Sequence, residues 1–387
     1  MNSRIRAGGL ALLIGAATLG VAPGAVGAAE SGYRIRVALV AAHRDVTVNS
    51  DAPLRVTAAG WKATMSGPLT VRLDGRRLNV NGRLVRPPVR MTGTSTVLSV
   101  DGTSVRGGLV ISVRDRHVFV VNELGLEDYV RSVVPSEVPS DWPLEALKAQ
   151  AVLARTYVLY QKAERKTSDF DVDATVQSQV YGGVPSEDGR TSEAVAATAG
   201  RVVLFDGRLA FTPYHSTSSG QTEDAMEVWG VDQPYLKGVD CSFDSASPAA
   251  RWTRRIPLEE IEAALGQAGY RVGPIASITP MSRNRSGRVS SVRIVHAGGA
   301  LVLKGEGLRR IIGYQRLPSM RFTLTEFAVN PDTRRVEAWF EGGGWGHGVG
   351  LCQWGMKALA ERGWTAERII TYYYPGTQVD VAPRTAR

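Results

Sequence analysis

Hydrophobic and polar residues alternate along most of the chain between Tyr33 and Asn122. Runs such as RIRVALV, LTVRLDGRRLNVNG and LVISVRDRHVFVV are separated by Asp-Gly and Asn-Gly pairs. A period of two is typical of strands with one buried face, and these dipeptides favour tight hairpin turns. The pattern therefore predicts a β-rich N-terminal region over residues 29–122.

Beyond Asn122 the apolar period becomes that of a helix. Helical spacing is followed by Leu126, Tyr129, Val130 and Val133. Pro135 and Pro139 should end this first helix, and a second should begin near Pro143 with Ser140 or Asp141 as its cap. The apolar stripe of the second helix consists of Leu147, Ala151, Ala154 and Val158.

The rest of the chain mixes short helices and strands. Helices are expected over residues 190–199, near 258–268, from GEGLRRIIG and over about 352–362, and strands at RVVLF, RLAF and RRVEAWFEG. No internal repeat or long low-complexity linker separates them. The fold class is therefore predicted as α+β, a mixed helical and β core over residues 123–380 that forms a substrate cleft.

The first residues have the pattern of an export signal. Arg4 and Arg6 precede an apolar run, and small residues follow, so residues 1–28 are read as a signal peptide cut after Ala28. An uncleaved membrane anchor is the alternative. No later stretch approaches transmembrane length, so no integral membrane domain is expected beyond this segment. The predicted location is the periplasm, the cell wall or the extracellular space.

Composition narrows the class of partner. The 387 residues are 43% hydrophobic and 21% charged, which is typical of a globular protein. The formal charge is +9, and loss of residues 1–28 removes two arginines and no acid. A basic exported protein suits a polyanionic cell wall. The alternative is that the positive charge only keeps the protein soluble, which would give the same net charge. Nucleic acid is not an expected partner, because export is predicted and no helix-turn-helix, zinc-finger or RNP pattern occurs.

Glu137 is the strongest candidate for an acid/base group. It lies between Pro135 and Pro139, which fix the backbone in what is predicted to be a connection between two helices. Lys148 and Arg155 are seven residues apart and share one face of the second helix, where they are candidates for binding substrate. Trp142 offers an apolar wall or a sugar-stacking face. The alternative for Glu137 is an ordinary solvated loop glutamate.

Two further segments carry candidate binding residues. In FTPYHSTSSGQTEDAMEVWG, the side chains of Tyr214, His215 and Ser216 suit hydrogen bonding to a polyhydroxyl substrate, or else cap a turn. A Ser-His nucleophile is not favoured, since no Gly-x-Ser-x-Gly elbow is present. In EGGGWGHGVGLCQWG, His347 is a candidate within a glycine-shaped turn, or else a structural hydrogen bonder there. Tyr373 belongs to a later tyrosine triplet, Tyr372 to Tyr374, of which one or two are expected to pack and one to reach the cleft.

No cofactor or metal site is predicted. The glycine-rich segment lacks the Gly-x-Gly-x-x-Gly order and a Walker lysine. His215, Cys241, His347 and Cys352 are zinc-compatible, but none forms the close pairs that make a zinc site specific. The sequence leaves open whether the two cysteines form a disulfide.

Taken in this order, the segments resemble the stage II sporulation protein D family, which also includes the amidase enhancers of the cell wall. The resemblance runs from about Leu124 to Gly376 and includes LEDYVRSVVPSEVPSDWPLEALKAQAVLARTY, YHSTSSGQTE and GGGWGHGVGLCQWGMKALAERGWTAERIITYYYPGT. It implies a lytic transglycosylase acting on glycan strands, with Glu137 as the catalytic glutamate and Lys148 as a cleft lysine. The family's cleft tyrosine falls on Tyr373 or a neighbour. Some members hold zinc through a cysteine where this chain has Ser218 and Ser219.

A lytic transglycosylase needs one carboxyl group, whereas ordinary glycoside hydrolysis needs two. The resemblance implies that Glu137 protonates the β-1,4 oxygen between N-acetylmuramic acid and N-acetylglucosamine and then deprotonates the C6 hydroxyl, giving 1,6-anhydro ends. Two alternatives stay open. One is a non-catalytic glycan-binding protein that stimulates a partner N-acetylmuramoyl-L-alanine amidase. The other is hydrolysis with Asp141, Glu223 or Asp232 as a second acid.

Overall fold

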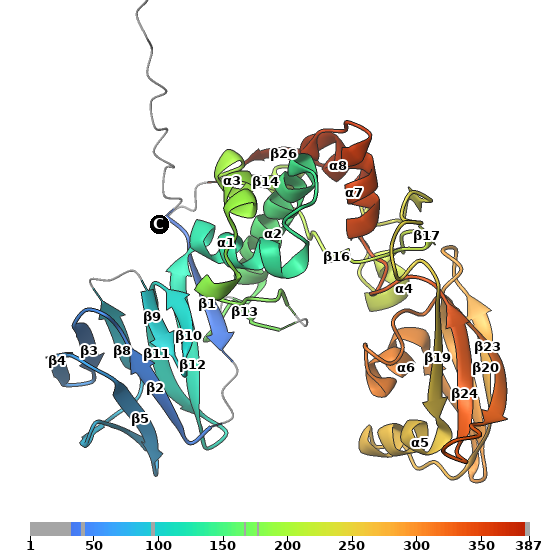
Figure 1. Cartoon of the computed structure of the whole chain (residues 1–387), viewed down its shortest axis with the longest axis horizontal. Coiled ribbons are helices and arrows are strands. Elements are labelled where there is room, and N and C mark those ends of the chain that lie inside the picture. Colours follow the sequence, from blue (N-terminus) through green and yellow to red (C-terminus); the bar gives the residue numbers. More distant parts are fainter. Residues whose placement is uncertain (1–31, 40–42, 94–96, 166–167, 176–177, 384–387) are drawn as a thin grey trace, which may run out of the picture.

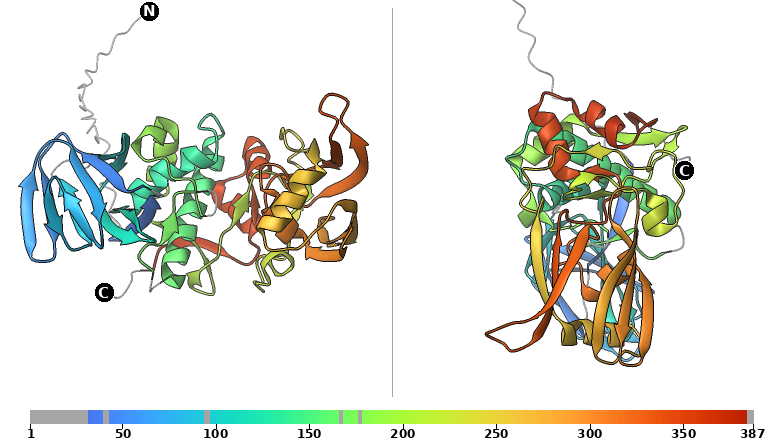
Figure 2. Two further views of the ribbon diagram at one scale, coloured as in Figure 1. Left: turned by 90° about the horizontal axis from the view of Figure 1, so that it is seen from below. Right: turned by 90° about the vertical axis from the view of Figure 1, so that its right-hand side faces the viewer.

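Three parts follow one another along the long axis of the molecule (Figures 1 and 2). The computed structural model describes residues 32–39, 43–93, 97–165, 168–175 and 178–383. Two β-sheets occupy one end, helices fill the middle, and a second β-rich subdomain occupies the other end. The mixed α+β class and the β-rich N-terminal region predicted from sequence are confirmed. The predicted signal peptide, residues 1–28, lies outside the described residues.

The N-terminal part is built from two sheets packed face to face. One has the strand order β13-β1-β12-β11-β8-β3-β4 and the other the order β10-β9-β2-β5-β6-β7. Along β2, Val46 and Val48 are buried while the residues between them are exposed, which is the alternation expected from the sequence. The strands are β1 (Arg34–Leu39), β2 (Asp45–Asn49), β3 (Leu54–Ala58), β4 (Trp61–Met65), β5 (Leu69–Asp74), β6 (Arg77–Val80), β7 (Arg83–Val85), β8 (Val89–Gly93), β9 (Val97–Val100), β10 (Thr103–Arg106), β11 (Gly108–Arg114), β12 (His117–Gly125) and β13 (Val172–Asp173).

Five helices form the middle of the molecule and share the hydrophobic core of the N-terminal sheets. They are α1 (Leu126–Glu137), α2 (Leu144–Glu164), α3 (Gly189–Ala197), α7 (Gln353–Glu361) and α8 (Ala366–Tyr373). Around them lie α4 (Ala225–Trp229), a 3-10 turn over Val184–Ser186, and the short strands β14 (Arg201–Phe205), β15 (Arg208–Leu209), β16 (Tyr214–His215), β17 (Gly220–Gln221), β18 (Asp240–Cys241), β25 (Leu351–Cys352) and β26 (Gln378–Val381).

Two details of the first helices differ from the sequence prediction. Helix α1 continues through Pro135 and ends at Glu137, because a proline one turn from the helix end removes a single hydrogen bond and already has a helical φ. Glu137 is therefore the last residue of a helix and not part of a free connection. Helix α2 begins directly after Pro143, which has no side-chain cap, so neither Ser140 nor Asp141 caps it.

A second hydrophobic core lies in the subdomain formed by residues 252–342. Its sheets have the orders β19-β24-β23 and β20-β21-β22. The elements are β19 (Trp252–Pro257), α5 (Leu258–Gln267), β20 (Ile275–Arg283), β21 (Val289–His296), β22 (Gly299–Lys304), α6 (Gly305–Ile312), β23 (Phe322–Val329) and β24 (Val336–Gly342). The sequence analysis expected the chain after residue 122 to form one unit. In the structure this region packs around two hydrophobic cores. Among the described residues, no helix combines the length and apolar character that a membrane crossing requires.

Candidate active site

Three segments that are distant in the sequence meet at the carboxyl group of Glu137. Its Oε1 accepts a hydrogen bond of 2.9 Å from the backbone N–H of Val180. The hydroxyl of Tyr214 and the side chain of Gln353 also hydrogen-bond to this carboxyl group. Gln353 Nε2 lies 3.4 Å from the main-chain oxygen of Glu137 as well, so the start of α7 is tied to the end of α1. The carboxyl group is held from three sides.

The surroundings of Glu137 raise its pKa above the usual value of 4.5. Burial is the largest cause, and the hydrogen bonds from Val180, Tyr214 and Gln353 oppose it in part. Within the part of the chain that the structure describes, no cationic side chain contributes to this balance. A carboxyl group with a raised pKa keeps its proton closer to neutral pH, which is what a general acid requires.

Tyr214 belongs to a buried chain of hydrogen bonds that fixes the direction of its own proton. The Tyr129 hydroxyl donates to Gln179 Oε1 over 2.9 Å, and Gln179 Nε2 donates to the Tyr214 hydroxyl oxygen over 3.0 Å. Since that oxygen accepts from Gln179, the Tyr214 hydroxyl proton points to Glu137. Burial raises the pKa of both tyrosines well above 10, so both remain phenols. The sequence analysis did not predict Tyr129 or Gln179 as site residues. The signals that could have pointed to them are the helical spacing of Tyr129 and the amide side chain of Gln179 in QSQVYGG.

A second carboxylate, Asp173, influences the pKa of Tyr129 and of the neighbouring Tyr157. Burial is the main cause of the raised pKa of Tyr129 and of Tyr157, and Glu137 and Asp173 both add to it. The oxygens of Asp173 accept from Ser178 Oγ over 2.7 Å and from the N–H of Thr175 over 3.0 Å. They are therefore occupied within their own loop.

The second acids considered from the sequence do not contact the Glu137 carboxyl group. Asp141 is exposed, and Asp232 forms an ion pair of 2.6 Å with Lys237. Glu223 is buried, and its Oε2 accepts from Ser286 Oγ over 2.6 Å. Each is engaged elsewhere or turned to solvent.

Lys148 lies on the predicted face of α2 but is engaged locally. Its Nζ donates to Glu145 Oε1 over 2.8 Å, and the other oxygen of Glu145 accepts from the N–H of Ala366 over 2.8 Å. Lys148 thereby helps to dock the start of α8, and a quarter of its side-chain surface stays exposed. Trp142, considered as a sugar-stacking face, is buried edge-on against Trp354 with ring centroids 5.4 Å apart.

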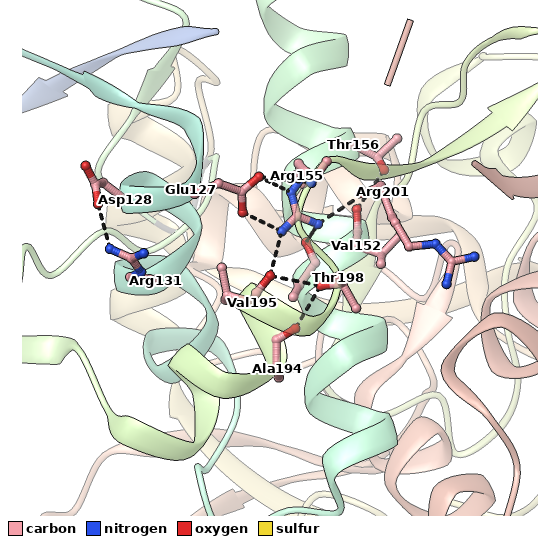
Figure 3. Close-up of polar contacts among 12 residues, drawn as sticks. Glu127, Asp128, Arg131, Val152, Arg155, Thr156, Ala194, Val195, Thr198 and Arg201 are labelled. Atoms are coloured by element: carbon pink, nitrogen blue, oxygen red, sulfur yellow. Dashed lines mark hydrogen bonds and ion pairs between the residues drawn. The ribbon is translucent and has the colours of Figure 1, made fainter. Parts of the chain in front are cut away.

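Arg155 differs most from its predicted role. Its side chain has no exposed surface and forms a two-pronged ion pair with Glu127, at 2.9 Å from Nε and 2.7 Å from Nη2 (Figure 3). Nη1 donates to the main-chain oxygen of Arg201 over 3.0 Å. The guanidinium group is thus enclosed by α1, α3 and β14. A residue in this position holds helices together and has no surface with which to bind substrate.

His215 is also a buried structural residue. Its Nδ1 lies 3.2 Å from the main-chain oxygen of Val349, an acceptor only, so Nδ1 carries the proton. Its Nε2 then accepts from the Ser218 hydroxyl over 2.7 Å. Burial lowers the pKa of His215 well below 6.5, and the positive charge of Arg288 adds to this effect. Ser216, half-buried beside it, hydrogen-bonds to Thr217 Oγ1 over 3.2 Å.

His347 keeps the glycine-rich turn closed over the Tyr214 segment. Its Nδ1 accepts from the N–H of Val349 over 3.0 Å, and its ring packs on Trp229 with centroids 4.8 Å apart. Burial is the main reason that its pKa falls to about 3, so the ring is neutral. Gly346 has φ +111°, and a Cβ there would lie 2.7 Å from that of His215, which is why glycine is needed at this close approach.

Two tyrosines of the triplet, Tyr373 and Tyr374, are buried in the core. Tyr373 is 2% exposed, and its hydroxyl lies 3.2 Å from Cys241 Sγ. The hydroxyl of Tyr374 donates to the main-chain oxygen of Pro213 over 2.6 Å, next to Tyr214. Tyr373 is therefore a core residue, and the tyrosine that reaches the Glu137 carboxyl group is Tyr214.

Cys241 and Cys352 are buried free thiols. Their Sγ atoms and a carboxylate oxygen of Asp244 lie within 4.8 Å of one another. Structural zinc takes four ligands, and the cluster among the described residues has three. Asp244 Oδ2 already accepts from the N–H groups of Ser218 and Ser219, each over 2.7 Å. The residues do not complete a zinc site, and no chemical step is derived from one.

The candidate site is that of an α+β protein with a half-buried, hydrogen-bonded glutamate at the end of a helix. The family model described as stage II sporulation protein matches residues 114–205, which include Glu137, and a domain of unknown function matches residues 226–350.

Similarity also extends to individual relatives. The chain is 32% identical to stage II sporulation protein D of Bacillus subtilis over 68% of this chain and 76% of that protein. It is 30% identical to an uncharacterized protein of Brachyspira hyodysenteriae over 89% of this chain and 92% of that one. An amidase enhancer of Bacillus subtilis is 30% identical, with 64% of this chain and 40% of the enhancer covered. The chain belongs to the stage II sporulation protein D family.

Proposed function

We propose that this protein is a peptidoglycan lytic transglycosylase in which Glu137 acts first as acid and then as base. The observation that carries the proposal is the raised pKa of a single carboxyl group held by Val180, Tyr214 and Gln353. Such a group is held in place, its raised pKa favours the protonated form that the first step needs, and its carboxylate can accept a proton afterwards. The family resemblance supports the same substrate class and a role in the cell wall.

The proposed reaction uses one proton donor and no water. Glu137 donates its proton to the β-1,4 glycosidic oxygen after N-acetylmuramic acid, and the C1–O bond breaks. The carboxylate then takes the proton of that sugar's C6 hydroxyl, and O6 bonds to C1 to close the 1,6-anhydro ring. The Tyr214 hydroxyl stabilises the carboxylate between these steps, since its proton points to Glu137.

Among the described residues, no carboxylate hydrogen-bonds to the Glu137 carboxyl group, which favours transglycosylation over hydrolysis. In hydrolysis, a second carboxylate activates water or attacks the sugar. Among the described residues, the groups that hydrogen-bond to the Glu137 carboxyl group are an amide N–H, a phenol and an amide side chain. Export to the wall, proposed from residues 1–28, would bring this group to its substrate.

The test compares the wild type with Glu137→Gln on purified glycan strands stripped of peptides. Mass spectrometry of the products should show 1,6-anhydro ends from the wild type and none from the variant. Glu361→Gln, which alters an exposed ion pair with Lys357, is the matched control and should cleave normally. Reducing ends would indicate hydrolysis. Absence of cleavage combined with stimulation of an added amidase would replace the proposal by the enhancer function.

A further inference from the structure

Trp229 is 40% exposed and is the most exposed tryptophan in the part of the chain that the structure describes. It is the last residue of α4, and Met226 on the same helix is 52% exposed. Residues three apart in a helix are neighbours on its surface, so these two side chains form one apolar surface, the α4 patch. No step of the proposed reaction uses the α4 patch, and exposed apolar side chains that lie together mark binding surfaces.

Two other rings hold the indole of Trp229 in place. Its centroid lies 4.8 Å from that of His347 and 5.7 Å from that of Phe211. The ring planes are tilted by 56° and 55°, so neither neighbour lies flat against the indole. The helix is fixed as well, because the Asp224 side chain accepts from the N–H of Met226 over 2.8 Å and caps its start. An aromatic ring that is fixed before binding loses little conformational entropy when a ligand packs on it.

One set of contacts connects the α4 patch to the Glu137 carboxyl group through His347. The imidazole of His347 packs on Trp229 and hydrogen-bonds to the main chain of Tyr214. The hydroxyl of Tyr214 in turn hydrogen-bonds to the Glu137 carboxyl group. Only two side chains, those of His347 and Tyr214, therefore separate the indole from the candidate acid on this path.

A second set of contacts runs through Phe211 and reaches the same site independently. The Phe211 ring lies 5.7 Å from that of Trp229 and 6.2 Å from that of Tyr157. Burial is the main cause of the raised pKa of Tyr157, and the charges of Asp173 and Glu137 add to it. Phe211 and Tyr157 are both half-buried, so part of each ring is accessible. The α4 patch is thus the exposed end of a row of rings that begins beside Glu137.

A flat aromatic surface beside a general acid suits a sugar ring. In a β-1,4-linked N-acetylhexosamine the polar substituents are equatorial, so C–H groups occupy both faces of the ring. Such a face can pack on the indole of Trp229, and Met226 offers an apolar contact for an acetyl methyl group. The α4 patch suits a protein partner less well, because two apolar side chains supply far less area than the roughly 800 Å² that each partner buries in a stable interface.

We propose that the α4 patch is a glycan subsite, in which the indole of Trp229 stacks on a sugar of the strand that Glu137 cleaves. The inference rests on the proposed function for its ligand, the peptide-stripped glycan strand. It gives the stacking role that the sequence suggested for Trp142 to a tryptophan with accessible surface. A sugar bound away from the scissile bond is held equally in the ground state and the transition state, so loss of the subsite should raise KM and leave kcat unchanged.

Calorimetry on the Glu137→Gln protein with a peptide-stripped glycan hexasaccharide tests the subsite without turnover. Adding Trp229→Leu keeps apolar bulk but removes the aromatic face, and it should weaken binding about tenfold, whereas Trp229→Tyr should keep most of the affinity. Met226→Glu alters the α4 patch at a largely exposed position, so it should weaken binding several-fold even if Trp229→Leu lowers stability. Tyr270→Leu, an exposed tyrosine that follows α5 in the C-terminal subdomain, is the matched control and should bind normally.

Tryptophan fluorescence gives a second readout, since the hexasaccharide should shift the emission of the protein with Trp229 to shorter wavelength and leave that of Trp229→Leu in place. Unchanged affinity in both Trp229→Leu and Met226→Glu would overturn the proposal. Normal glycan binding by these variants together with loss of amidase stimulation would also overturn it, because the α4 patch would then contact a protein. A wild type that fails to cleave the strands would refute the transglycosylase proposal, whereas weaker glycan binding by Trp229→Leu would still support the subsite.

Discussion

The buried ion pair between Arg155 and Glu127 makes the sharpest prediction about stability. Replacing Arg155 with leucine leaves the Glu127 carboxylate, which is 16% exposed, without its cation. It also leaves the main-chain oxygen of Arg201 without its 3.0 Å donor. The perturbation is therefore an uncompensated charge and a lost acceptor partner inside the helical core (Figure 3).

The magnitude follows from how completely the pair is enclosed. Arg155 has no exposed surface, and two hydrogen bonds of 2.9 and 2.7 Å join it to Glu127. Removing one partner of such a pair costs about 3–5 kcal/mol, whereas replacing both by apolar residues of similar size is often close to neutral. We expect Arg155→Leu to lose about 3–5 kcal/mol and the double variant with Glu127→Leu to recover most of it.

Urea unfolding followed by circular dichroism measures these differences, and binding to glycan strands is measured in parallel. Lys148→Met is the control, because its ion pair with Glu145 is partly exposed and should contribute less than about 1 kcal/mol. An Arg155→Leu protein with unchanged stability but no affinity for glycan would refute the reasoning and return Arg155 to the binding surface.

Three further predictions concern protonation. Tyr214→Phe removes a hydrogen bond that lowers the pKa of Glu137, so the alkaline limb of the pH–activity profile should move to higher pH, while Tyr372→Phe should leave it in place. Because the pKa of Glu137 is raised above 4.5 in the fold, its contribution to stability is lost as pH rises through that pKa. Glu137→Gln should therefore gain stability relative to wild type above pH 4.5, by about 1.4 kcal/mol per pKa unit. An unfolding series over pH that shows no gain would contradict this prediction. The pKa of His347 is about 3, so its NMR signals should not titrate between pH 4.5 and 8, and its contribution to stability should fall as pH drops from 6.5 toward 3; a midpoint near 6 would show that the turn is open.

Local patterns in the sequence were sufficient for most elements. Period-two alternation located the N-terminal strands, and helix α3 and the hairpin of β14 and β15 matched their expected positions. The end of α1 was misplaced because Pro135, close to the end of the helix, costs one hydrogen bond without ending the helix. The second core could not be recognised from a linker in the sequence. The chain enters and leaves this core through two ordinary strands, β19 and β24, and not through a segment of distinctive composition.

The site itself depended on long-range contacts. Spacing placed Lys148 and Arg155 on one face of α2, but only the packing of α1 and α3 decides that Arg155 faces inward. Tyr214 reaches Glu137 because β16 pairs in parallel with β25, a strand 137 residues further along the chain. Sequence spacing within one segment carries no information about such a pairing, so it could not decide between the two candidate tyrosines, Tyr214 and Tyr373.

The first and last residues of the C-terminal subdomain lie next to each other. Trp252 at the start of β19 stands directly opposite Gly342 at the end of β24 in an antiparallel ladder. Opposite residues in such a ladder have Cα atoms about 5 Å apart, which a tight turn can bridge. The whole stretch between them can therefore be gained, lost or exchanged in evolution by a single insertion or deletion, while the segments on either side keep their places around Glu137.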